Sequence, residues 1–203
     1  MAEPNSKFLS PGEYLARERV AEIKSEYLAG EMFAMSGGSR AHSLICVNLI
    51  REASGRLGAS SSCEVHTSDL RVKSAATGLY TYPDVTIVCG ERHFDDEQRD
   101  TLLNPTVLFE VLSPTTEAYD RGRKFEHYAR ILSLRHYVLV DQFRAHVDVL
   151  SLENGKWTIT AADGLDATIE LTAIGLQIPL REVYRQVDLS EDEPERLPSD
   201  AKP

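Results

Sequence analysis

Cysteine is scarce in this 203-residue sequence. Its three cysteines, Cys46, Cys63 and Cys89, are odd in number and lie far apart. This spacing makes neither a zinc knuckle nor an obvious disulfide framework, so cysteine usage favours a reducing, cytoplasmic setting. The N-terminus lacks a basic-then-apolar signal pattern, and no apolar run approaches the roughly 18 residues that span a membrane. We therefore expect a cytoplasmic protein without a membrane segment.

Positive charge is also in short supply. The formal net charge of -10 argues against a protein that coats nucleic acid through a broad basic surface. The charge is unevenly spread, because residues 188–203 carry six acids and two bases, whereas residues 121–146 carry six Lys or Arg and two acids. This basic segment could receive phosphates, or it could form an ordinary solvated helix face.

What the sequence does contain is enough apolar surface for one core. A hydrophobic content of 42% in a chain of this length is typical of a single globular domain. The segment from residue 189 onward is acidic, contains proline and has no apolar periodicity, as in disordered chains. We therefore divide the chain into a flexible leader (1–12), one domain (13–188) and a disordered acidic tail (189–203).

Apolar periodicity predicts an α+β domain. We expect helices over 12–30, 41–57, 125–132 and 180–186. We expect strands over 30–35, 64–73, 82–88, 107–112 and 136–140, a hairpin of 145–152 with 156–160, and a strand or two from residue 168. The two short apolar strands at 82–88 and 107–112 should be neighbours, and the helix at 125–132 should lie on the sheet.

These two strands each carry one carboxylate where a core strand should be apolar. They are Asp84 and Glu110, and Glu110 lies inside the run Val-Leu-Phe-Glu-Val-Leu. An unpaired charge there would be costly, so it needs a partner. If the register lets the two carboxylates meet, Mg²⁺ is the usual occupant of such an oxygen site. The cation could activate a water, and Lys124 on the following helix could stabilise the anion that develops on a phosphate.

Several residues in and around these two strands together resemble the pattern of a known family. The residues that carry the resemblance are Pro83-Asp84, Glu110-Val111-Leu112, Asp120, Lys124, Tyr128 and 137–141, together with Gly30-Glu31 and His42. As a combination they resemble the Uma-type restriction endonucleases of the PD-(D/E)xK nuclease superfamily, over roughly residues 12–187. The sequence departs from the general superfamily pattern at Leu112, where a lysine is expected two residues after the glutamate.

The resemblance implies a restriction-endonuclease-like fold, which is a mixed β-sheet flanked by helices. It also implies that Asp84 and Glu110 bind the metal, with Mn²⁺ as a substitute for Mg²⁺, and that Lys124 takes the role of the missing lysine. Glu31, His42 and Asp120 are possible supporting residues. We expect a nucleic-acid partner, DNA, and a homodimer.

Each site residue also has a purely structural interpretation. Asp84 could close a turn by accepting hydrogen bonds from backbone amides. Glu110 could form a buried salt bridge with an arginine, and Lys124 could be the surface partner of Asp120 four residues earlier. His42 near a helix start could be a capping or packing residue. Glu31 is the exception, because the role expected for it is that of an outer-sphere ligand.

The sequence therefore supports a metal-dependent phosphodiesterase that cleaves DNA with a metal-activated water. The alternative is a catalytically inactive nuclease-fold protein that binds nucleic acid or a protein partner. A purely structural dimerisation module would predict neither cleavage nor metal binding.

Overall fold

The computed structural model describes residues 8–35 and 37–189. The helical segments are α1 (Pro11–Glu18), α2 (Arg40–Leu57), α3 (Glu117–Tyr119), the π-helical turn η1 (Asp120–Lys124), α4 (Phe125–Tyr128), the 3-10 turn η2 (Thr172–Ile174) and α5 (Leu180–Val183). The strands are β1 (Ser25–Leu28), β2 (Glu31–Ala34), β3 (Cys63–Thr67), β4 (Arg71–Ser74), β5 (Leu79–Thr81), β6 (Val85–Cys89), β7 (Thr101–Leu102), β8 (Val107–Leu112), β9 (His136–Asp141), β10 (His146–Glu153), β11 (Lys156–Asp163), β12 (Thr168–Leu171) and β13 (Leu176–Pro179).

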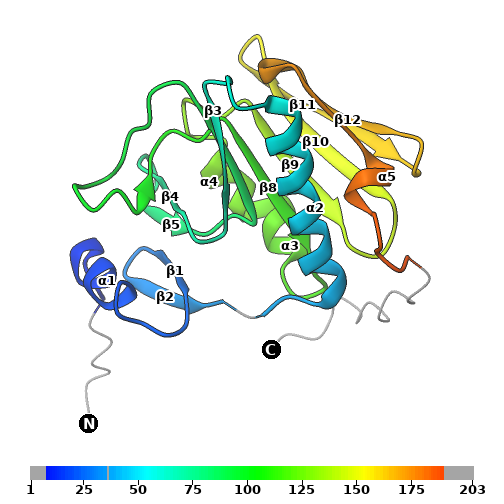
Figure 1. The fold of residues 1–203 in the computed structure, drawn as a ribbon. Helices are drawn as coiled ribbons and strands as arrows, with labels where there is room; N and C mark the ends of the chain where they lie inside the picture. Colours follow the sequence, from blue (N-terminus) through cyan, green and yellow to red (C-terminus); the bar gives the residue numbers. More distant parts are fainter. Residues whose placement is uncertain (1–7, 36, 190–203) are drawn as a thin grey trace.

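The centre of the fold is a mixed six-stranded sheet in the order β11-β10-β9-β8-β6-β3. β8 and β9 are parallel, and β8 and β6 are antiparallel. Successive side chains of β8 point to opposite faces of the sheet. Phe109 packs with Ile45 of α2 on one face, and Leu108 packs with Tyr128 of α4 on the other. Figure 1 shows the sheet between these two helices. The expected α+β sheet flanked by helices is confirmed.

A second, five-stranded sheet, in the order β2-β1-β5-β4-β7, lies beside the first and joins the N-terminal segment to the domain. One side of β1 packs in an aromatic cluster of Tyr14, Tyr27 and Tyr80. The ring centroids of Tyr14 and Tyr27 are 4.8 Å apart. Because this cluster anchors β1, the opposite side of β1 is held in a fixed position facing the large sheet.

Several predicted elements are confirmed with nearly the expected bounds. α2 runs to Leu57 and is followed by Gly58 with a positive φ of 72°, a conformation that glycine adopts at low cost. The strands β6, β8 and β9 fall where they were expected, and β6 and β8 are neighbours. The predicted hairpin is β10-β11, with Asn154 and Gly155 both at positive φ in its turn.

The predicted helix over residues 12–30 is wrong in its second half. α1 ends at Glu18, and Ser25–Leu28 is the strand β1. The apolar residues that suggested a longer helix do not share a buried face, because Val20 is 83% exposed and Ile23 is 64% exposed. The segment instead alternates between buried and half-buried side chains from Ser25 onward, which is the pattern of a strand.

Two other predicted elements need correction. The single strand expected over 64–73 is two strands, because the chain turns between Thr67 and Arg71 and β4 joins the other sheet. The helix expected over 125–132 begins earlier, at Glu117, and ends at Tyr128. Leu132 is 92% exposed, so its helical spacing from Tyr128 does not reflect packing.

The cysteine prediction is also wrong. Cys63 and Cys89 stand opposite each other in the β3–β6 pair and form a disulfide, which leaves Cys46 as the free thiol. Spacing along the chain could not reveal this pair, since it depends on the register of two strands. With this disulfide, cysteine usage no longer favours a reducing compartment.

Two further expectations concern the ends of the chain and membranes. Residues 1–7 of the expected leader and residues 190–203 of the expected tail lie outside the described residues. Within the described ranges, no helix has both the length and the apolar character needed to cross a membrane.

Candidate active site

The register of β6 and β8 brings the two anomalous carboxylates together. Val85 pairs with Phe109 in this antiparallel ladder, so one further step sets Asp84 opposite Glu110. Residues directly opposite each other in antiparallel strands have their side chains on the same face. Both carboxylates line the same cavity. Glu110 contacts Lys124 and Tyr128 on the face covered by α3, η1 and α4, whereas Asp84, just before the start of β6, contacts His42 of α2.

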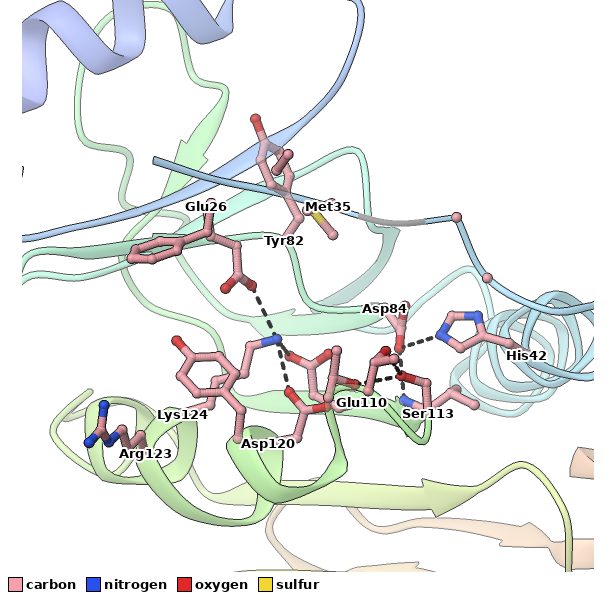
Figure 2. A pocket seen from close by; sticks show the side chains of 18 of the residues that line it. Glu26, Met35, His42, Tyr82, Asp84, Glu110, Ser113, Asp120, Arg123 and Lys124 are labelled. Carbon is pink, nitrogen blue, oxygen red and sulfur yellow. Dashed lines mark hydrogen bonds and ion pairs between the residues drawn. The ribbon is translucent and has the colours of Figure 1, made fainter. Parts of the chain in front are cut away.

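Lys124, on η1, is the centre of this group. Its Nζ lies 2.9 Å from Glu110 Oε1, 3.3 Å from Asp120 Oδ1 and 3.2 Å from Glu26 Oε1. Figure 2 shows the ammonium between these three carboxylates. Lys124, Asp120 and Glu110 are only 6%, 2% and 5% exposed. The prediction of Lys124 as a surface partner of Asp120 is thus wrong: the two do pair, but inside the protein.

Two buried tyrosines hold the acidic residues in place. The Tyr128 hydroxyl donates to Glu110 Oε1 at 2.9 Å, and the Tyr137 hydroxyl donates to the backbone oxygen of Asp120 at 3.0 Å. Both tyrosines are completely buried, and their rings make an edge-to-face contact. Glu110 thus has a lysine and a tyrosine as partners, rather than the arginine that the structural interpretation of its sequence suggested.

Glu26 was missed by the sequence analysis. It lies on β1, where Ser25 and Tyr27 are buried toward the aromatic cluster, so Glu26 and Leu28 face the opposite way. The Thr81 hydroxyl donates to Glu26 Oε1 in addition to the ion pair with Lys124. The signal that could have identified Glu26 was the alternation of β1, which was hidden because this segment was interpreted as helix.

Asp84 is held by one backbone amide and one imidazole. Its Oδ2 accepts a hydrogen bond from Val111 N at 2.7 Å and lies 3.2 Å from His42 Nε2. His42 occupies the first turn of α2, where its own backbone N–H donates to the Ser39 side chain at the N-cap. The structural roles foreseen for Asp84 and His42, backbone bonding and an N-terminal helix position, are therefore both present, and both side chains also face the acidic group.

These side chains line a cavity of about 500 Å³. Besides the acids, Lys124 and His42, its wall includes the apolar residues Leu28, Phe33 and Met35 from the first hairpin. The exposed Arg123 also lines it. Glu31 does not: it is exposed on β2 and is absent from the lining, so the structure does not bring it to the group formed by Asp84, Glu110 and Lys124.

Negative charge is in excess at this cavity: its lining has four carboxylates (Glu26, Asp84, Glu110 and Asp120) against Lys124 and Arg123, and three of the four pair with Lys124. Burial raises the pKa of Glu110 well above its ordinary value, and the charges of Asp120 and Asp84 raise it further, against the opposing effect of Lys124. Burial also raises the pKa of Asp120. Burial alone would lower the pKa of Lys124, but Glu110 and the other acids raise it well above its usual range.

The donor set suits a hard divalent cation. Among the described residues, Glu110 Oε2 and Asp84 Oδ1 accept no hydrogen bond, and the buried Asp120 Oδ1 also lacks one despite its ion pair. Such oxygens are the ligands that Mg²⁺ and Mn²⁺ prefer. A cation would also offset the like charges that burial makes costly.

Comparisons with known proteins agree with this description. The mixed sheet flanked by helices defines the class of restriction-endonuclease-like folds. A sequence profile of the Uma2 family, described as "Putative restriction endonuclease", matches residues 11–181. The chain therefore belongs to the Uma2 family.

Relatives cover nearly the whole chain. "Uncharacterized protein slr1290" of Synechocystis sp. (strain PCC 6803) is 38% identical over 185 residues, which is 90% of this chain and 95% of the relative. "Uncharacterized protein sll1609" of the same organism is 34% identical over 173 residues, with 85% and 97% covered.

A solved structure shows the same fold. It is the crystal structure of a "putative nuclease belonging to DUF820" from Anabaena variabilis, with a TM-score of 0.72 and 18% sequence identity. The match covers 87% of this chain and 97% of that chain. The predicted restriction-endonuclease-like fold is thus confirmed.

Proposed function

We propose that this cavity is the active site of a Mg²⁺-dependent endonuclease that cleaves DNA. The observation that carries the proposal is the excess of carboxylates around one buried lysine, at a cavity, in a chain of a restriction-endonuclease family. A cation bound there would lower the pKa of a bound water and neutralise charge on a scissile phosphate. Asp84 and Glu110 would hold it, and the nearby oxygens of Asp120 and Glu26 would support it.

The other residues orient this group and contact the substrate. Lys124 is placed to stabilise the negative charge that develops on the phosphate during cleavage. Tyr128 orients the Glu110 carboxylate, and His42 orients that of Asp84. Arg123, exposed at the cavity, is suited to bind a neighbouring phosphate of the DNA backbone.

One observation favours a second candidate function, a catalytically inactive nuclease-fold protein that binds nucleic acid or a protein. The ammonium of Lys124 already pairs with three carboxylates, and the usual lysine position is taken by the buried Leu112. If the cation does not release Lys124 from these partners, the phosphate would lack a cationic contact at this point.

Cleavage of plasmid DNA separates the two candidates. We expect the purified protein to cut DNA with Mg²⁺ or Mn²⁺ and not with a chelator, and we expect Glu110→Gln to lose cleavage. Glu170→Gln is the matched control, because Glu170 is exposed on β12 and is not among the residues that line the cavity. Metal-independent cleavage, or equal cleavage by Glu110→Gln, would refute the proposed site; folded protein without any cleavage would favour the binding function.

We also propose a homodimer, formed through β11. This eight-residue strand is one edge of the six-stranded sheet, and Ile159 on it is 66% exposed. Exposed edge strands are templates for pairing with another chain. If two copies of β11 pair antiparallel about their common centre, Lys156 of one faces the partner's Asp163, so the edge is complementary in charge to itself.

A further inference from the structure

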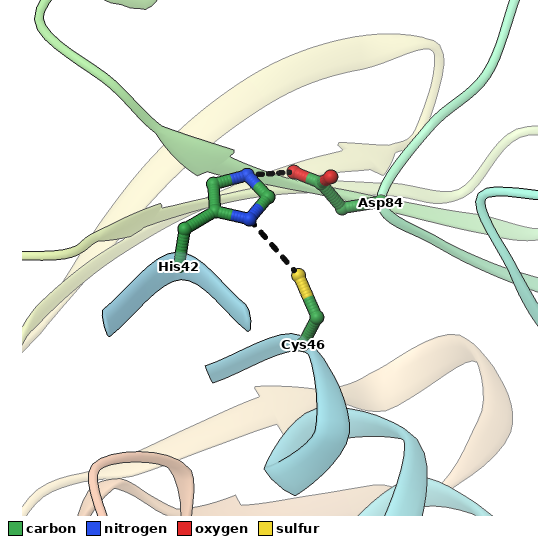
Figure 3. A group of neighbouring side chains, drawn as sticks. All are labelled: His42, Cys46 and Asp84. Atoms are coloured by element: carbon green, nitrogen blue, oxygen red, sulfur yellow. Dashed lines mark hydrogen bonds and ion pairs between the residues drawn. The ribbon is translucent and has the colours of Figure 1, made fainter. Parts of the chain in front are cut away.

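One turn of α2 carries a second group of donors beside the acidic cavity. His42 and Cys46 are four residues apart on the helix, so their side chains lie on the same face. His42 Nδ1 lies 3.6 Å from Cys46 Sγ, and His42 Nε2 lies 3.2 Å from Asp84 Oδ2. Figure 3 shows the imidazole between the thiol and the carboxylate. One donor atom of each residue lies within 4.8 Å of the others.

An imidazole gives only one of its nitrogens to a metal ion, whereas the thiol and the carboxylate here face different nitrogens of His42. With Zn–N and Zn–O bonds of about 2.1 Å and a Zn–S bond of about 2.3 Å, the donors of a tetrahedral site are about 3.4–3.6 Å apart. One donor atom of each residue lies within 4.8 Å of the other two, so the side chains must rotate to bring the three donors around one ion. The backbone of Gly38 packs against the imidazole, since a Cβ at this position would lie 2.8 Å from His42 Nδ1.

The chemistry of the donors differs from that of the acidic cavity. Thiolate and imidazole ligands select Zn²⁺ and similar metals, whereas Mg²⁺ prefers oxygen ligands. Cys46 is not suited to act as a nucleophile, because burial, together with the charges of Asp84 and Glu110, raises the pKa of its thiol. A metal would instead displace the thiol proton, which passes to solvent as Sγ binds the ion.

We propose that His42, Cys46 and Asp84 form a second metal site, for Zn²⁺ or a similar soft divalent cation, with solvent as the remaining ligand. Asp84 belongs to both sites, so an ion held by His42 and Cys46 withdraws this carboxylate from the hard-cation site. Zn²⁺ and Mg²⁺ would then antagonise each other. The inhibitory part of this inference rests on the proposed nuclease function, but the metal site does not.

The test uses Co²⁺ as a spectroscopic substitute for Zn²⁺, added to the metal-free full-length protein. A thiolate bound to Co²⁺ gives a charge-transfer absorption band, and Cys46 is the one cysteine outside the disulfide. We expect this band in the wild-type protein and its loss in Cys46→Ser. His42→Gln removes a direct ligand, so it should weaken Co²⁺ binding by more than the 10–100-fold that loss of an outer-shell partner costs.

His66→Gln is the matched control, because His66 lies on β3 outside this group and pairs with Glu64. It should bind Co²⁺ as the wild type does. Absence of the band in the wild type, or its persistence in Cys46→Ser, would overturn the site. Wild-type affinity in His42→Gln would overturn it as well.

Competition tests the shared carboxylate. Excess Mg²⁺ should weaken Co²⁺ binding measured by the same band, and no effect of Mg²⁺ would refute the sharing of Asp84. The absorption band reports metal at Cys46 whether or not DNA is cut. The experiment can therefore contradict the second metal site and the nuclease function independently of each other. A band without DNA cleavage removes only the nuclease, and Mg²⁺-dependent cleavage without a band removes only the second site.

Discussion

Glu110 is a buried strand residue whose charge has several neighbours of both signs. Its contacts with Lys124 and Tyr128 satisfy Oε1, while Asp84 and Asp120 oppose its ionisation. Removing its charge therefore relieves repulsion as well as an ion pair. Lys124 would still pair with Glu26 and Asp120.

This balance predicts opposite results for two substitutions. Glu110→Gln should change the free energy of unfolding of the metal-free protein by less than about 1 kcal/mol, or raise it, because one of several like charges is removed. Lys124→Met should cost about 3–5 kcal/mol, because it leaves buried carboxylates without a counter-charge. Urea denaturation measures both values.

The matched control for the lysine is Lys73→Met. Lys73 pairs with Asp95 at 2.7 Å and does not line the cavity, so its loss should cost less than about 1 kcal/mol. If Glu110→Gln strongly lowered the free energy of unfolding and Lys124→Met changed it little, the cavity would not have the excess of negative charge on which the metal site depends.

The raised pKa of Glu110 predicts a dependence of stability on pH. The folded state binds this proton more tightly than the unfolded state, whose pKa is near 4.5. The contribution of Glu110 to the free energy of unfolding is therefore largest below about pH 4.5. It is lost as the pH rises through the pKa that Glu110 has in the folded state. As the pH rises above about 5, the metal-free wild type should lose more stability than Glu110→Gln does. Parallel curves for the two proteins would show that Glu110 ionises normally.

At the scale of the elements, the site depends on a π-helical turn that no sequence pattern suggested. η1 places Asp120 and Lys124 inside the protein, while Gly122 and Arg123 between them are exposed. π-helical turns inside α-helices are frequent at functional sites. Charge spacing alone made this segment indistinguishable from a solvated helix face.

Gly122 offers a test of how rigid this turn needs to be. Its backbone is helical, and a Cβ there would meet no atom within 4 Å. Gly122→Ala should therefore raise the free energy of unfolding by about 0.4–1 kcal/mol, since it restricts the unfolded chain. Gly155→Ala is the control: its Cβ would also be in open space, but its φ of +77° makes alanine unfavourable, so stability should fall. A loss of stability in Gly122→Ala would show that the turn requires glycine.

The elements also show what the sequence could and could not predict. β6 and β8 were predictable because each is short, buried and rich in β-branched residues. Their pairing in the sheet was predictable because they follow each other closely along the chain. β1 was not predictable, because Tyr27 and Leu28 continue a helical spacing of apolar residues that is an accident of composition. Glu26 was missed for the same reason, because it lies on β1. The Cys63–Cys89 pair was missed because the register of two strands is set by tertiary contacts.

At the scale of the whole molecule, the dimer proposed through β11 predicts an effect of one surface residue. Ile159→Lys places a charge at the centre of the exposed edge strand. Natural sheets use such charges on edge strands to prevent pairing with another chain. We expect the wild type to have the mass of a dimer by light scattering and Ile159→Lys that of a monomer. Val47→Lys, an exposed apolar residue on α2, is the control and should stay dimeric. A monomeric wild type, or a dimeric Ile159→Lys, would refute this interface.

The expected tail makes a second prediction at this scale. Leu189 packs against the core, so the deletion should begin after it. Residues 190–203 are acidic and lack apolar periodicity, so their removal should leave the melting temperature nearly unchanged. A drop of several degrees would show that this segment contributes to folding.

The proposed active site requires Asp84 and Glu110 to bind a divalent cation together, and the melting temperature tests this binding without knowledge of the DNA target. At about 100 times its dissociation constant, a cation should stabilise the wild type by roughly 2.7 kcal/mol, which raises the melting temperature by several degrees. Melting curves in EDTA, Mg²⁺ and Mn²⁺ should show this rise in the wild type and in Glu170→Gln, and no rise in Asp84→Asn or Glu110→Gln. No response to either metal in the wild type, or an undiminished response in both carboxylate variants, would contradict a shared metal site at Asp84 and Glu110.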